Sequence, residues 1–204
     1  IRDCWIRTDD DCIAIKGLGR RGGRDAVENI LVENTVLWAD RARAVLVGHE
    51  SRAERMRGIR LRNLDIIHCS MTPLLIEPGE EMPIEEIDVE SVRVHAEGWR
   101  PAYGLEDDLD PISRKWDFIA LHPSVNYWME DKTPGRIRRA SFRDIHLIGR
   151  DDGKDYALWL GGSSETHDVA DVDFQNVTIF GETARPDHPR VQVGAFTRRI
   201  RFLD

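Results

Sequence analysis

The sequence has little of what defines several broad classes of protein. No apolar run approaches the roughly 20 residues that a membrane-spanning helix needs, so we expect no membrane partner. Positive charge is not in excess, because 29 Lys and Arg residues stand against 37 Asp and Glu residues and the net charge is −8. We therefore do not expect a surface that binds nucleic acid by neutralising its phosphates.

Cysteine is also scarce. The three cysteines, Cys4, Cys12 and Cys69, show no CxxC spacing, so the sequence indicates neither a disulfide framework nor a zinc site. We expect them to be small buried side chains. The acidic cluster at 106–110 lacks the spacing of a calcium loop, and the GxGxxG match at 17–22 leaves no room for the helix of a dinucleotide site. No metal and no cofactor are expected.

The chain begins at Ile1 without an initiator Met or a basic leader followed by an apolar stretch. We interpret it as a segment of a longer protein, incomplete at both ends. Its 204 residues, of which 41% are hydrophobic, suit one domain with a core of its own.

A short phrase recurs along the chain, in which apolar residues alternate around a polar position. It reads VENTVLW, LRNLDII, VESVRVH, FRDIHLI and FQNVTIF. The shared polar position falls on these residues, about 28 to 32 apart with one longer interval: Asp3, Asn34, Asn63, Ser91, Asp144, Asn176 and, one interval further, Asp204. Asn and Asp suit a turn whose side chains bond to the coils above and below.

A second strand-length run follows each phrase, and these runs lie at 12–16, 44–48, 73–77, 118–122, 156–160 and 190–194. The apolar residues alternate with a period of two, which predicts strands and excludes helical repeats. Stacked coils of this length predict a single-stranded, right-handed parallel β-helix of about six coils over residues 1–204.

Two segments interrupt the repeat and predict loop insertions, near 98–116 and 126–135. They place five aromatic residues beside the middle coils, where solenoids often build a binding face. These residues are Trp99, Tyr103, Trp116, Tyr127 and Trp128.

Alternation along the second runs predicts which side chains face inward. The expected core positions are Ile13, Ile15, Val45, Val47, Leu74, Ile76, Ile119, Leu121, Leu158, Leu160, Val191 and Val193. The outward-facing positions of these runs then include Lys16, Glu77, His122, Trp159 and Gln192. This mixture of acid, base, imidazole and indole is typical of a sugar-binding cleft, although a solvated strand face is also polar.

Three consecutive carboxylates, Asp9, Asp10 and Asp11, stand just before the first such run. Crowded carboxylates repel one another, and this raises the pKa of one member, as an acid and base pair requires. Glycoside hydrolysis uses one protonated carboxyl and one ionised carboxylate. An Asx-rich turn between two strands is the alternative interpretation.

The stretch IRTDDDCIAIKG resembles the Asp-Asp signature of glycoside hydrolase family 28, the polygalacturonase-like enzymes. The resemblance implies a right-handed parallel β-helix and inverting hydrolysis. It implies that Asp10 is the general acid and that Asp11 holds and activates the hydrolytic water. A third carboxylate is then expected about one coil upstream of Ile1. Asp9 occupies the position of a family glycine and is a third candidate participant.

Other family motifs are changed in this chain. Arg43 stands where the family has the His of a Gly-His-Gly, and Glu77 stands in place of the Arg-x-Lys that grips a uronate. Because a carboxylate is held by cations, polygalacturonate is a doubtful substrate. Residues 36–68 are more similar to the dextranase-like family 49.

These motifs together predict an inverting glycoside hydrolase that acts on a polysaccharide or oligosaccharide. The resemblance implies an extracellular or periplasmic location. The candidate substrate-binding residues are Lys16, Arg43, His49, Glu50, His68, Glu77, His122, Trp128 and Trp159. A β-helix polysaccharide lyase and a non-catalytic carbohydrate-binding or spike protein remain alternatives.

Overall fold

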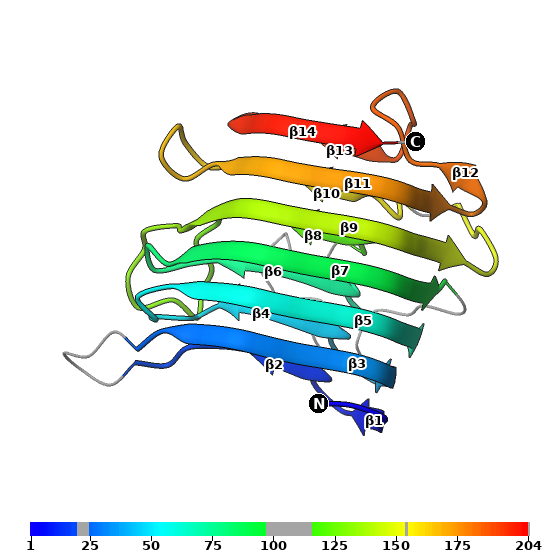
Figure 1. The fold of residues 1–204 in the computed structure, drawn as a ribbon, viewed down its shortest axis with the longest axis horizontal. Helices are drawn as coiled ribbons and strands as arrows, with labels where there is room; N and C mark the ends of the chain where they lie inside the picture. Colours follow the sequence, from blue (N-terminus) through cyan, green and yellow to red (C-terminus); the bar gives the residue numbers. More distant parts are fainter. Residues whose placement is uncertain (20–24, 97–115, 154, 204) are drawn as a thin grey trace.

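A computed structural model describes residues 1–19, 25–96, 116–153 and 155–203. The described residues form β-strands joined by turns and loops (Figure 1). Within these ranges there is no helix that is long and apolar enough to cross a membrane. The predicted insertion at 98–116 falls, apart from Trp116, outside the described residues, as do Trp99, Tyr103 and Asp204.

Most strands are parallel and form two stacked sheets. Sheet A consists of β1 (Trp5–Thr8), β3 (Val27–Ala39), β5 (Met56–His68), β7 (Pro83–His95), β9 (Arg136–Ile148), β11 (Val169–Ile179) and β14 (Thr197–Leu203), with the short β12 (Glu182–Thr183) antiparallel to β11. Sheet B consists of β2 (Ile13–Ile15), β4 (Val45–His49), β6 (Leu74–Pro78), β8 (Ile119–Leu121), β10 (Leu158–Leu160) and β13 (Val191–Val193).

The chain passes from one sheet to the other in every turn, so the six strands of sheet B mark six turns of a solenoid. In Figure 1 the strands of sheet A run to the right in front and those of sheet B run to the left behind while the chain rises, which is a right-handed winding. The predicted parallel β-helix is therefore confirmed. The β8–β9 segment, residues 123–135, is a loop that protrudes from the coil, in agreement with the insertion predicted near 126–135.

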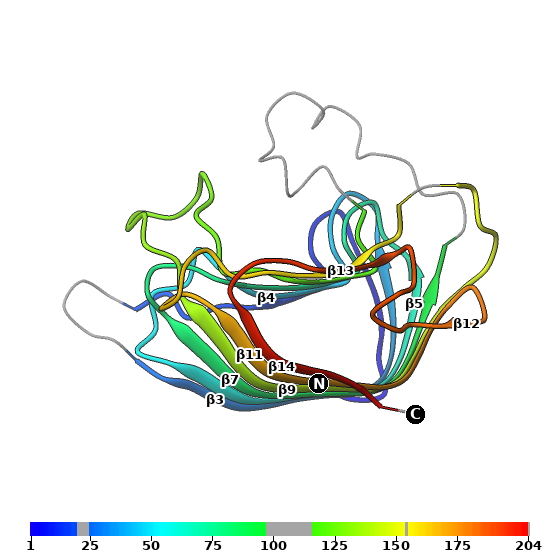
Figure 2. The same cartoon turned by 90° about the horizontal axis from the view of Figure 1, so that it is seen from above.

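The long strands of sheet A bend, so each covers two sides of the cross-section (Figure 2). One bend lies at the predicted polar position, where the backbone φ angles from Asp3 to Asn176 are all between 48° and 57°. Asn and Asp tolerate this left-handed conformation better than other residues with side chains. The residues of this column therefore follow from the shape of the coil.

Side chains of the column bond across coils, but not without interruption. Asn34 Nδ2 donates to Asp3 Oδ1 at 3.0 Å, and Asn63 Nδ2 donates to Asn34 Oδ1 at 3.0 Å. The next member, Ser91, has a shorter side chain, and Arg93 donates to Asn63 Oδ1 instead, at 3.1 Å. The predicted ladder is thus correct for the first coils and is replaced by an arginine in the middle. It resumes in the later coils, where Asn176 Nδ2 donates to Asp144 Oδ1 at 2.6 Å.

A second left-handed column, which the sequence does not predict, lies five residues earlier in each strand. No single residue type is common to its members, whose φ angles lie between 52° and 68°. The members are Asn29, Gly58, Glu86, Arg139, Asp171 and Arg199. Only a structure reveals this bend, because its residue types vary.

The core is continuous from coil to coil, and the inward positions predicted for sheet B are buried in it. Val193 is the exception, at 44% exposure, because it lies in the last coil. Trp116 was expected on a binding face but is buried, and its Nε1 donates to the carbonyl of Cys69 at 3.2 Å. Of the cysteines only Cys69 is buried, and Cys4 is exposed because it precedes the first strand at the edge of the solenoid.

The outer face of sheet A carries charges that pair between neighbouring coils. Arg62 lies 3.5 Å from Asp88 and 3.7 Å from Glu90, and Arg143 approaches the same two carboxylates from the other side at 3.4 and 3.5 Å. Arg93 and Asp65 form a further pair across two coils. We call this surface the ion-pair face.

Candidate functional site

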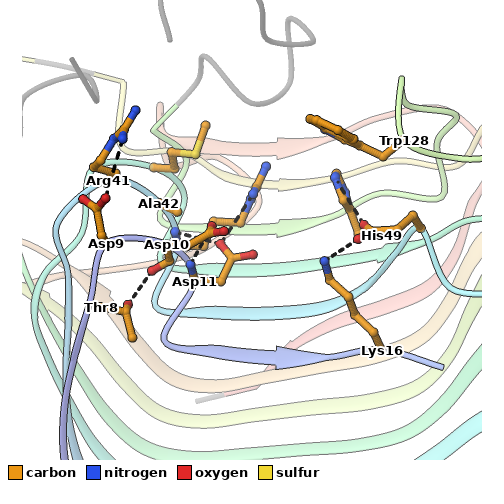
Figure 3. A pocket seen from close by; sticks show the side chains of 12 residues that line it. Thr8, Asp9, Asp10, Asp11, Lys16, Arg41, Ala42, His49 and Trp128 are labelled. Carbon is orange, nitrogen blue, oxygen red and sulfur yellow. Dashed lines mark hydrogen bonds and ion pairs between the residues drawn. The ribbon is translucent and has the colours of Figure 1, made fainter. Parts of the chain in front are cut away.

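A pocket of about 800 Å³ opens where the first two coils enter and leave sheet B. Figure 3 shows its lining residues, which come from the turns around β2 and β4, from the turn before β6 and from the β8–β9 segment. The lining consists of Thr8, Asp9, Asp10, Asp11, Lys16, Arg41, Ala42, Arg43, His49, Glu50, Met71 and Trp128. Eight of these are residues that the sequence predicts for the site.

Asp11 and Arg43 form one end of the pocket. They are neighbours because residues 32 apart occupy the same position in successive coils. Asp11 Oδ1 accepts the backbone N–H of Arg43 at 3.0 Å and lies 3.5 Å from its guanidinium, and both side chains are only 9% exposed. Both contacts fall on Oδ1, which leaves Oδ2 as the oxygen that a water molecule can approach.

Asp10 and Asp9 lie on the solvent side of Asp11. The Asp10 carboxylate accepts the backbone N–H of Asp11 at 2.8 Å, and the Thr8 hydroxyl donates to the Asp10 carbonyl, so the turn is fixed at both ends. Asp9 lies 3.6 Å from Arg41 and its side chain is 75% exposed. Among the described residues, no cation lies within ion-pair distance of Asp10, so its carboxylate is the one that a ligand can reach without breaking an ion pair.

The other end of the pocket is a chain of polar groups. Lys16 Nζ donates to Glu50 Oε1 at 2.5 Å, and Glu50 Oε2 lies 3.8 Å from His49 Nε2. His49 Nδ1 contacts the carboxylate of Glu77 from the other side of the ring. One imidazole thus stands between two carboxylates, with Glu50 on its Nε2 side and Glu77 on its Nδ1 side.

Glu77 is a buried carboxylate, 1% exposed, and its partners satisfy both oxygens. His49 and Ser124 contact Oε2 and Oε1, and Asn126 Nδ2 lies 3.3 Å from Oε2. Burial raises the pKa of Glu77, but the hydrogen bonds from His49 and Ser124, with the charges of His49 and Arg43, outweigh it and hold the pKa below its usual range. Glu77 is therefore ionised near neutral pH, and it positions His49 rather than lining the pocket.

Burial likewise raises the pKa of Glu50, and the Lys16 ammonium more than compensates, so the pKa of this carboxyl is also lowered. Both carboxylates beside His49 are therefore negative. The conformation of His49 is unusual, because it has a φ of 58° and follows Gly48 with a φ of 99°. A Cβ at Gly48 would lie 2.4 Å from the carbonyl oxygen of Glu77, so glycine is required where the chain turns His49 into the pocket.

Three residues predicted for the site lie elsewhere. His68 stacks on Trp38 at 5.0 Å at the end of sheet A, where burial lowers its pKa against the opposing charge of Asp40. The rings of His122 and Trp159 pack against each other at a tilt of 54°, with centroids 4.3 Å apart, on the outer face of sheet B. Trp159 packs there against an apolar cluster formed by Leu46, Leu75 and Ala120. None of the three lines the pocket.

Other residues of the site were not predicted. Arg41 could have been, because it follows Asp9 by the same one-coil offset that relates Arg43 to Asp11. Ser124 and Asn126 could not, because they reach Glu77 from 47 and 49 residues away on a segment without a repeat. Within the described ranges, no three His, Cys, Asp or Glu side chains are grouped so as to hold a metal ion.

Comparison of the chain with protein-family models, curated protein sequences and solved structures finds no match. The interpretation of the pocket therefore rests on its own residues and on the motif in which Asp10 and Asp11 occur.

Proposed function

We propose that the protein is a glycoside hydrolase that cleaves a polysaccharide or oligosaccharide with inversion at the pocket around Asp10. The observation that carries this proposal is that Asp10 is an exposed carboxyl in a large polar pocket, held by the N–H of Asp11, while the neighbouring Asp9 and Asp11 are engaged by arginines. A proton donor to a glycosidic oxygen needs this access and this fixed geometry.

In this mechanism Asp10 protonates the leaving oxygen. Asp11 orients the water through Oδ2, since its Oδ1 accepts the Arg43 N–H and lies 3.5 Å from the Arg43 guanidinium. An inverting enzyme keeps its acid and base carboxyls roughly 6.5 to 9.5 Å apart, so that a water molecule fits between the base and the sugar. The carboxylate that the family resemblance implies upstream of Ile1 would share in holding this water.

The pocket supports a lyase less well. A lyase abstracts a proton beside a uronate and needs cations to hold the carboxylate. The three cations of the pocket, Lys16, Arg41 and Arg43, each lie within ion-pair distance of a carboxylate of the pocket itself.

The test is product analysis by mass spectrometry with a panel of neutral and pectic glycans, comparing the intact parent protein with its Asp10→Asn form. The Asn oxygen can still accept the Asp11 N–H, so the turn is preserved and only the proton donor is lost. We expect saturated products whose rate of formation falls about 10²- to 10⁴-fold in the variant, and NMR should show an inverted anomeric centre.

Asp187→Asn is the matched control, because this exposed aspartate lies in a turn of the last coil, away from the pocket. Unsaturated products would identify a lyase instead. Glycan binding without turnover by either form would identify a carbohydrate-binding protein, and an active Asp10→Asn would exclude Asp10 as the acid.

A further inference from the structure

The tip of the β8–β9 segment presents two large aromatic side chains to solvent. Tyr127 is 79% and Trp128 is 60% exposed, and their rings pack edge to face with centroids 5.2 Å apart. Exposed aromatic pairs of this kind are unfavourable in water and typically mark a binding surface. We call Tyr127 and Trp128 the aromatic platform.

The segment under the platform is held by a lysine. Lys132 Nζ donates to the carbonyls of Asn126 at 3.0 Å and Tyr127 at 3.2 Å, and also to that of Met129. One ammonium group thus closes the loop around its own tip. Met129 is buried against Gly79, where even a Cβ would not fit.

A buried carboxylate holds the other side of the segment. Glu80 Oε1 accepts the backbone N–H groups of Glu130 at 2.5 Å and Asp131 at 3.3 Å. Arg52 joins Glu80 and Glu130 by ion pairs. The platform is therefore fixed before any ligand arrives, and a ligand loses little free energy in ordering it.

The platform and the polar end of the pocket form one structural unit. Trp128 lines the pocket, and its backbone N–H donates to Asn126 Oδ1 at 2.9 Å. Asn126 Nδ2 in turn lies 3.0 Å from His49 Nδ1 and 3.3 Å from Glu77. A ligand that contacts Trp128 therefore lies in the same pocket as His49, which also lines it.

This unit lies well away from the proton donor. Asp11 and Lys16 stand at opposite ends of β2, and five residues of extended chain span about 16 Å. Figure 3 shows the same separation, with Asp10 and Asp11 toward one side of the pocket and His49 and Trp128 toward the other. This distance corresponds to several linked sugar rings rather than one.

Charge around the platform disfavours an acidic sugar. Lys16 is paired with the partly buried Glu50, and the buried Glu77 is a second carboxylate beside His49. Glu130 and Glu80 add two further negative charges, with Arg52 between them. Lys132 lies under the platform, so these four carboxylates stand against three cations. A uronate carboxyl would face an excess of carboxylates here.

We infer that the aromatic platform is a distal subsite that stacks the C–H face of a neutral pyranose ring, several units from the bond cleaved at Asp10. This inference rests on the proposed hydrolase and specifies its substrate. The substrate is a neutral polysaccharide bound along its chain, and short oligosaccharides that cannot reach from Asp10 to Trp128 bind more weakly.

The test separates binding from cleavage. Affinity for dextran, laminarin, galactan and polygalacturonate, and for neutral oligosaccharides of increasing length, is measured by calorimetry on the Asp10→Asn chain, which should not degrade them. In that background Trp128→Ala should weaken binding of the preferred long neutral glycan by about three- to tenfold, and should leave the affinity for short oligosaccharides unchanged. Trp5→Ala is the matched control, since Trp5 is 61% exposed and lies on β1 outside the pocket.

Lys132→Met tests whether the rigidity of the platform matters, because both aromatic rings remain while the loop loses its closure. We expect its affinity to lie between those of the parent and of Trp128→Ala. Equal affinities for Trp128→Ala and Trp5→Ala would overturn the inference, as would tighter binding of polygalacturonate than of any neutral glycan. A change in sedimentation in Trp128→Ala without a change in glycan affinity would assign the platform to protein contacts.

Failure of the proposed function looks different. If the intact parent protein cleaves no glycan, or if its Asp10→Asn form cleaves as fast as the parent, the hydrolase fails whatever Trp128 does. If the parent cleaves a neutral glycan and Trp128→Ala binds it normally, the hydrolase stands and only the distal subsite is lost.

Discussion

On the outer face of sheet A, charges pair from coil to coil, whereas on the outer face of sheet B each coil contributes a different kind of side chain. Arg62 and Arg143 lie on either side of Asp88 in the ion-pair face. In sheet B the lane that begins at Lys16 continues through Gly48 and Glu77. Positions at which opposite charges alternate from coil to coil stabilise the stacking of the coils. Positions at which the residue type differs in every coil are the better place to look for a functional site.

Substitution of a glycine should cost much more stability on sheet B than on sheet A, and this is the largest contrast we expect. Gly48→Ala places a Cβ against the backbone of Glu77 at a φ of 99°, so the free energy of unfolding should fall by at least about 3 kcal/mol. Gly58→Asn, on sheet A, should stay within about 1 kcal/mol of the parent, because other coils carry side chains at the same φ. Urea denaturation measures both, and equal losses would show that the bends of the two sheets are equivalent.

Removing the imidazole should have the next largest effect. His49→Ala leaves Glu77 buried with Ser124 and Asn126 as its remaining partners. We expect a loss of about 2 kcal/mol, since a buried carboxylate that loses a hydrogen-bond partner is destabilising. Glu77→Gln in the His49→Ala background should recover part of this loss. An additive effect of the two changes would mean that the residues are not coupled.

The two faces should also differ in their dependence on pH and salt. The folded pKa of Glu77 lies below its ordinary value of 4.5. The unfolded chain therefore binds a proton first as the pH falls, and the stability from this group is present above about pH 4.5 and is lost as the pH passes down through the folded pKa. The hydrogen bond from Arg93 lowers the pKa of Asp65 in sheet A in the same direction, against a smaller effect of burial.

Salt distinguishes these contributions. At about 1 M NaCl the Debye length is about 3 Å, so the ion pairs of sheet A are screened while the buried Glu77 is not. The acid-induced loss of stability that remains at high salt should disappear in Glu77→Gln. If high salt removes the whole pH dependence of the parent chain, Glu77 contributes none of it.

A single change on the ion-pair face should have the smallest effect. Arg143→Ala removes contacts to Asp88 and Glu90. We expect less than about 1 kcal/mol, because exposed pairs gain little over their hydration. A double-mutant cycle with Glu90→Ala measures the pair directly. If the coupling energy of Arg143 and Glu90 were as large as that of His49 and Glu77, the ion pairs of sheet A would contribute as much stability as the buried contacts beside the pocket.

The sequence predicts the fold well because the signals of the coil are local. Alternation in runs such as 44–48, and the polar residue at positions such as Asn34 and Asn63, depend only on the path of one coil. The acidic end of the pocket is predictable for the same reason, since Asp10 and Asp11 are adjacent in the chain.

The polar end of the pocket is less predictable, because its partners come from a segment with no period. Glu77 was expected on the substrate side, but Ser124 and Asn126 cover it and make it a support for His49. Trp116 was assigned to a binding face and lies in the core, where its ring packs edge to face against Tyr156. A loop that is distant in the sequence can bury a side chain that the alternation of its own strand predicts to be exposed.

The contacts among His49, Glu77 and Asn126 also affect how the solenoid comes apart. They join β4, β6 and the segment after β8, which are three successive coils, whereas the coils of a solenoid otherwise contact only their nearest neighbours. Terminal coils of such an array can open separately. The coils tied together here must open as one cooperative unit, so the backbone amides of β4 and β6 should be among the slowest to exchange with solvent, and the polar end of the pocket should persist while the chain ends fray.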